Sequence, residues 1–101
     1  MFKSSQLIDE IKIKYFYYSD NDVAKKLGVS RAAVSRYRKG TGSIEDKLAV
    51  EIAEMLRLDP MQVLASMRIE RAERNNSLTE VVFWKRYTRK INASKSNLLN
   101  V

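Results

Sequence analysis

The sequence contains no cysteine and no histidine. Their absence excludes thiolate nucleophiles and imidazole bases, and it removes the usual protein ligands of zinc. There is also no glycine-rich phosphate loop, and the carboxylates are scattered along the chain. We therefore expect no enzyme activity, no cofactor, no metal and no small-molecule substrate.

Glycine and proline are scarce, with three glycines and one proline among 101 residues. No long segment alternates apolar and polar residues, so we expect helices and no sheet. No apolar run approaches the roughly 20 residues that a membrane span needs, and residues 1–5 lack an apolar signal core. The sequence therefore predicts an all-α, cytoplasmic protein that does not enter a membrane.

Positive charge is abundant but unevenly distributed. The 19 Lys and Arg residues outnumber the 12 Asp and Glu residues, for a net charge of +7. Residues 19–43 carry six basic and two acidic side chains, residues 44–73 carry four and seven, and residues 74–101 carry six and one. A basic protein attracts polyanions, nucleic acid first and anionic membranes second. The charge favours residues 19–43 or 74–101 as the binding face, not the acidic middle.

Apolar periodicity and capping residues predict six helices, at approximately residues 4–18, 20–27, 31–39, 44–57, 60–73 and 77–91. Ser4 or Ser5 is the expected cap of the first, and Ser30 of the third. Asp59 followed by Pro60 marks the start of the fifth helix. The motif from Ser77 to Glu80 is a capping box for the sixth. Residues 92–101 are predicted to form a polar tail.

Residues 20–39 meet the demands of two short helices that cross steeply over a tight turn. Ala24 is small where the helices nearly touch, and Gly28 tolerates the positive φ that the turn needs. Five apolar residues have the spacing needed to face the core: Val23, Leu27, Val29, Val34 and Tyr37. The outer face of the second helix is cationic. The segment therefore predicts a helix-turn-helix that binds double-stranded DNA.

These residues resemble the helix-turn-helix of the lambda-repressor/Cro superfamily. Ala24, Gly28 and Val34 stand at that family's offsets, with one expected helix before the motif and two after it. The run 23–40 is also similar to small regulators of filamentous phages and prophages. The resemblance covers about residues 5–73. It implies a five-helix lambda-repressor-like DNA-binding domain over residues 1–73. Residues 74–101 lie outside the family pattern, and their own apolar spacing and capping box predict an additional C-terminal helix and tail.

The resemblance also implies which residues contact DNA. Base edges would be met from the third helix by Ser30, Arg31, Ala32, Ser35, Arg36 and Lys39. Arg31 and Arg36 would bond guanine through two hydrogen bonds each, and Ala32 would lie against a thymine methyl group. Phosphates would be held by backbone N–H groups of residues 41–43 and by the side chains of Asn21, Lys25, Arg38, Thr41 and Ser43.

Two further side chains of the motif are treated differently. Asp20 is not expected to contact DNA, because a carboxylate repels phosphate unless it caps the helix. Tyr37 is expected in the core, with a phosphate contact through its hydroxyl group as the alternative.

The sixth helix has more apolar residues than one small core requires, and they wrap around more than half of it. Three uses are open: packing on the domain's own core, a homodimer interface, or a basic amphipathic surface on a membrane or on DNA. The first two are compatible. The residues expected at a dimer interface are Val81, Phe83, Trp84, Tyr87 and Ile91.

The expected function is transcriptional regulation, as a phage- or prophage-type repressor that binds a pseudo-palindromic operator as a homodimer. Two alternatives share the fold. One is an antitoxin that represses its own gene and binds a toxin through its C-terminal segment. The other is an antirepressor-like module that binds another regulator.

Overall fold

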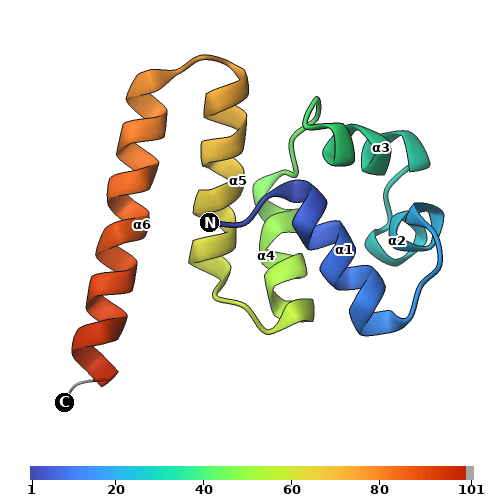
Figure 1. Cartoon of the computed structure of the whole chain (residues 1–101), viewed down its shortest axis with the longest axis horizontal. Coiled ribbons are helices and arrows are strands. Elements are labelled where there is room, and N and C mark those ends of the chain that lie inside the picture. Colours follow the sequence, from blue (N-terminus) through green and yellow to red (C-terminus); the bar gives the residue numbers. More distant parts are fainter. Residues whose placement is uncertain (100–101) are drawn as a thin grey trace.

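The computed structural model describes the backbone of residues 1–99 and the side chains of residues 1–89 (Figure 1). The described chain contains helices and no strand, which confirms the all-α prediction. In order, the helices are α1 (Ser4–Tyr15), α2 (Asp20–Leu27), α3 (Arg31–Lys39), α4 (Asp46–Leu56), α5 (Pro60–Arg74) and α6 (Leu78–Leu99). None of these helices combines the length and apolar composition needed to cross a membrane.

Local signals in the sequence set several helix ends. The Ser30 hydroxyl accepts the Ala33 N–H at 3.0 Å and caps α3, as predicted. Asp59 caps α5 through the Met61 N–H, with Pro60 as the first helical residue. These caps satisfy backbone N–H groups that have no partner within the helix.

Three helix boundaries differ from the prediction by two residues or more. Helix α1 ends at Tyr15 instead of residue 18, because Phe16 adopts a left-handed φ of 57° that stops the helix. Helix α4 begins at Asp46, since Ile44 is buried in the preceding loop. Helix α6 continues to Leu99, through residues expected to form a polar tail. Residues 92–99 contain neither glycine nor proline, so nothing in the sequence stops the helix there.

The start of α1 is held by α5 and not by a serine cap. Lys3 occupies the cap position without a side-chain bond. Instead, the Glu70 carboxylate accepts the Ser4 N–H at 2.9 Å and the Ser4 hydroxyl at 2.8 Å. A carboxylate at a helix N-terminus also interacts favourably with the helix dipole. The first helix is therefore fixed to the fifth.

One hydrophobic core joins α1–α5. Its largest fully buried side chains include Leu7, Ile8, Ile11, Val23, Val34, Ile44, Ile52 and Val63. Every helix from α1 to α5 contributes to this core, so the elements that carry the predicted DNA face cannot shift independently.

Helix α6 lies antiparallel beside α5, on the side away from α1–α3 (Figure 1). Thr88 is buried, and the Gln62 side-chain amide donates to the Thr88 carbonyl at 3.4 Å. The Arg68 guanidinium lies 5.6 Å from the centre of the Trp84 ring. The two helices thus form a hairpin that flanks the core.

Candidate nucleic-acid interface

The α2–α3 junction has the geometry that the sequence predicts. Gly28 adopts a left-handed φ of 70°, and the Val29 N–H donates to the Ala24 carbonyl at 3.0 Å. Ala24 is buried where the helices meet. A larger side chain at Ala24 would push α3 away from α2, so this small residue sets how α3 is presented.

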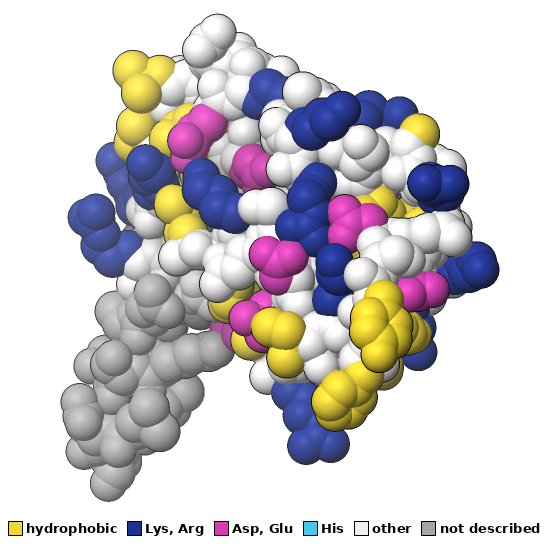
Figure 2. Space-filling model, turned by 45° about the vertical axis from the view of Figure 1, so that its right-hand side comes forward, with side chains coloured by type: hydrophobic (Ala, Val, Ile, Leu, Met, Phe, Trp, Pro, Cys, Tyr) yellow, Lys and Arg dark blue, Asp and Glu magenta, His cyan; other side chains and the backbone are white. Residues whose placement is uncertain are grey.

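Helix α3 separates its apolar and cationic residues onto opposite faces. Ala33, Val34 and Tyr37 are buried. The opposite face holds the six residues predicted to meet base edges, all of them exposed or half-buried: Ser30, Arg31, Ala32, Ser35, Arg36 and Lys39. Helix α3 contains no acidic residue. In Figure 2, Lys and Arg side chains follow the upper right edge of the molecule, where Figure 1 places α3.

A groove of about 530 Å³ runs between α3 and the start of α2. Its lining includes Arg31, Ser35 and Lys39 from α3 and Asn21 from α2. Asn21 is therefore beside the face of α3, where a phosphate contact was predicted. Lys25 is exposed further along α2, and it is not part of the groove lining.

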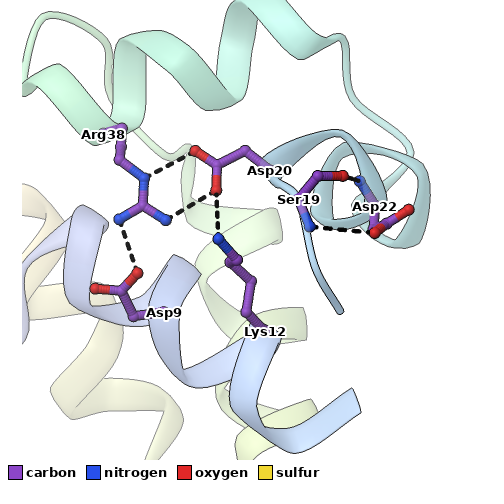
Figure 3. A network of polar contacts seen from close by, with 6 residues as sticks. All are labelled: Asp9, Lys12, Ser19, Asp20, Asp22 and Arg38. Atoms are coloured by element: carbon purple, nitrogen blue, oxygen red, sulfur yellow. Dashed lines mark hydrogen bonds and ion pairs between the residues drawn. The ribbon is translucent and has the colours of Figure 1, made fainter. Parts of the chain in front are cut away.

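Arg38 is bound to carboxylates from two other helices (Figure 3). Its Nε and Nη2 donate to Asp20 at 2.8 and 2.9 Å, and its Nη1 donates to Asp9 at 2.8 Å. The predicted phosphate contact by Arg38 conflicts with this arrangement, because the guanidinium already serves two carboxylates. Arg38 instead ties α3 to α1 and α2.

The negative charge of Asp20 is compensated by neighbouring basic side chains. Hydrogen bonds from Arg38 lower the pKa of Asp20 against the opposing effect of burial, and Lys12 contributes a further ion pair at 3.4 Å. The same bonds raise the pKa of Arg38. The cap of α2 is Ser19, in a reciprocal pair with Asp22. A carboxylate beside the predicted DNA face is thus compensated by Arg38 and Lys12, without acting as a cap.

The loop between α3 and α4 differs from the prediction in its backbone. The N–H groups of Thr41 and Gly42 both donate to the Arg36 carbonyl, at 3.0 and 3.2 Å. These two N–H groups close the end of α3 and are not free to hold phosphate, which corrects the expectation for Thr41 and Gly42. For the Ser43 N–H the phosphate contact stays a prediction. A Cβ on Gly42 would lie 2.8 Å from the Arg36 Cβ, so only glycine allows this close approach. The Thr41 side chain is exposed and that of Ser43 half-buried.

A contact to this loop from α5 was missed by sequence reasoning. The Arg74 Nη2 donates to the Ser43 hydroxyl, and its Nη1 donates to the Gly40 carbonyl at 3.5 Å. More than 30 residues separate Arg74 from both partners, with separations of 34 and 31. The only signal in the sequence was a basic residue at the predicted end of the fifth helix.

Tyr37 occupies the core, as expected. Its side chain is buried, and burial raises the pKa of its hydroxyl, with a smaller contribution from the charge of Glu45. A buried, neutral phenol is a packing residue. The alternative of a phosphate contact has no support from this position.

The five residues predicted for dimerisation differ in how far they are buried. Val81 and Trp84 are half-buried, with Trp84 against Arg68 of α5. Phe83 and Tyr87 are exposed. The side chain of Ile91 lies outside the described residues. Helix α6 thus packs on α5 with one side and leaves apolar side chains uncovered on the other, including Leu78 at 75% and Phe83 at 58% exposed.

Part of the chain matches a known protein family. Residues 17–62 match the model of a helix-turn-helix family, of the lambda-repressor/Cro type. The matched segment contains α2, α3, α4 and the first turn of α5. No curated protein and no solved structure matches the chain.

Proposed function

We propose, from the premise that residues 17–62 form a helix-turn-helix domain of the lambda-repressor/Cro type, that the chain is a repressor that binds a pseudo-palindromic operator as a homodimer. The match of residues 17–62 supports the coarser part of this proposal, a DNA-binding transcriptional regulator. The resemblance of residues 23–40 to small phage regulators is the basis on which we propose a phage or prophage repressor.

The observation that carries the proposal is the outer face of α3. Arg31, Arg36 and Lys39 are exposed on it, small side chains lie between them, and no acidic residue of the helix competes for them. A face of this kind fits into the major groove, which is about 12 Å wide, and its arginines can bond guanine O6 and N7. The N-terminal residues of α3, Ser30 to Ala32, would then lie closest to the base edges.

Contacts to the DNA backbone would set the position of α3. In this proposal they come from Asn21 beside the groove, from Lys25 on α2, and from Thr41 and Ser43 after α3. Such contacts position a protein without reading sequence. Arg38 is left out of this group because its carboxylate partners hold it.

We propose a homodimer for two reasons: one recognition helix is too small for selective binding, and one side of α6 is uncovered. One recognition helix reads few base pairs, and paired helices read half-sites about 34–36 Å apart. Phe83 and Tyr87, exposed aromatic side chains, are suited to a subunit interface.

Selection of bound sequences from random duplex DNA, at physiological salt, tests the proposal. We expect an inverted repeat whose half-sites are separated by about 10–10.5 base pairs or a multiple of that spacing. The Arg31→Ala, Arg36→Ala double variant is the control and should enrich no common sequence. Binding without any sequence enrichment by the unaltered chain would contradict a specific operator.

One observation favours a second function. Leu78, Val82 and Phe83 are exposed. Apolar side chains of this kind are not required for DNA binding, and they suit contact with another protein. In an antitoxin, this surface would bind a toxin while α3 binds the operator. Co-expression with the product of the neighbouring gene distinguishes the two, since a stable complex lost on Phe83→Asp would identify the antitoxin.

A further inference from the structure

Among the half-buried arginines, Arg38, Arg68 and Arg74 differ in their partners. Arg38 bonds Asp9 and Asp20, and Arg68 bonds Asp46 through two of its nitrogens. Arg74 bonds only neutral oxygens among the described residues, the Ser43 hydroxyl and the Gly40 carbonyl. The charges of the first two are therefore compensated within the fold, whereas that of Arg74 is not.

The uncompensated charge lies at a particular place, the loop that follows the recognition helix. Residues 40–43 are closed onto Arg36 by the two backbone hydrogen bonds and by the close approach of Gly42. Arg74 reaches the same loop from the last turn of α5. In the proposed binding mode, α3 lies in the major groove, so the loop at its end meets the phosphates that border the groove.

We propose that Arg74 binds a DNA phosphate at this loop, together with the Ser43 hydroxyl group. This rests on the proposed function and adds to it a residue outside the matched segment 17–62. A guanidinium carries five N–H donors in a fixed fork, and the two bonds of Arg74 to the loop leave other donors for a phosphate oxygen. A phosphate would supply the negative charge that the fold supplies to Arg38 and Arg68.

The consequence is that α5 takes part in DNA binding. Arg74 is the last residue of α5, and α6 begins at Leu78, only a short turn later. The corner that leads into the C-terminal helix is thereby fixed to the loop after the recognition helix. The Arg74 side chain then connects the end of α3 to the turn that leads into α6.

The test compares Arg74→Ala and Arg74→Lys with the unaltered chain, on the selected operator and on a duplex of arbitrary sequence. For Arg74→Ala we expect affinity to fall roughly threefold to tenfold on both duplexes. The magnitude of the slope of log affinity against log salt concentration should fall by about 1, which corresponds to one lost phosphate contact. The base preference should not change. Arg74→Lys keeps the charge and should restore the slope. Arg68→Gln is the matched control on the same helix and should keep the slope.

Phosphate ethylation interference on the operator gives a readout that a purely structural role would not move. One sensitive phosphate in each half-site should disappear in Arg74→Ala. An unchanged slope and interference pattern in a folded Arg74→Ala variant would overturn the inference alone. So would a loss of base preference that Arg74→Lys does not restore, because Arg74 would then act only through the loop. Absence of DNA binding by the unaltered chain would instead overturn the proposed function.

Discussion

Helices α3 and α6 are both basic surface helices, but they use their apolar side chains in opposite ways. Helix α3 buries Val34 and Tyr37 and exposes cations. Helix α6 buries Thr88 and leaves Leu78 and Phe83 uncovered. Solvent-exposed cations bind a polyanion such as DNA. Exposed apolar groups instead favour binding to a protein partner that removes them from water. This contrast is consistent with the proposal that one chain presents two surfaces for two kinds of partner.

The largest expected difference between the two helical regions is in folding stability. Leu27→Ala in the helix-turn-helix should lower the free energy of unfolding by about 2–5 kcal/mol, because Leu27 belongs to the core. Leu78→Ala in α6 should lower it by less than about 0.5 kcal/mol, because the side chain is 75% exposed. Urea denaturation at low protein concentration measures both. Equal costs would remove the contrast between the two regions.

The next effect concerns the cationic face of α3. Arg31→Ala and Arg36→Ala should each weaken operator binding by about 1–3 kcal/mol and relax the preference for the base contacted. Arg86→Ala, on exposed α6, is the control and should have a smaller effect. Titration at fixed salt measures all three. Unchanged operator affinity in both α3 variants would remove the recognition role from this face.

The third prediction concerns the uncovered side of α6. Phe83→Ala should weaken dimerisation by more than about 1 kcal/mol, because an exposed aromatic side chain at an interface is typically an anchor. Glu80→Gln on the same helix is the control. Sedimentation equilibrium over a concentration series measures the dissociation constant. If the unaltered chain is a monomer at micromolar concentration, α6 does not pair with a second copy.

The smallest effect concerns the ion pairs that brace α3. The pKa of Asp20 is lowered in the folded protein, so its pairing stabilises the fold above its unfolded pKa of about 3.9 and is lost as pH falls through the lowered folded value. Asp20→Asn should remove this contribution at neutral pH, by less than about 1 kcal/mol since solvent screens the pair.

Thermal melts as a function of pH test this prediction. The loss of stability below about pH 4 should be shallower in Asp20→Asn than in the unaltered chain. The exposed Glu51→Gln variant on α4 serves as the control and should follow the unaltered chain. Parallel curves for the Asp20 variant and the unaltered chain would show that the Arg38–Asp20 pair does not contribute.

Local features could be predicted from the sequence, and contacts between distant residues could not. The α2–α3 turn depends on Ala24 and Gly28 at a fixed spacing, and the caps Ser30 and Asp59 act within three residues. Those signals correctly placed α3 and its polar face.

The roles of individual basic residues depend on partners far along the chain. Arg38 was expected to contact DNA like its neighbour Arg36, because a helical pattern does not show that Asp9 lies opposite. The bonds of Arg74 to the α3–α4 loop were hidden for the same reason. A basic residue in a sequence can bind a carboxylate or a phosphate, and only the fold distinguishes the two.

The bond between Ser4 and Glu70 has a consequence for how the protein is made. The two residues are 66 positions apart, so α1 gains its N-terminal partner only after α5 has been synthesised. Helix α1 in turn supplies Asp9, which holds Arg38 of α3. During translation, the recognition helix would therefore emerge from the ribosome before its support is complete. We therefore expect the predicted DNA-binding surface to reach its final form late, once the ends of the domain have met.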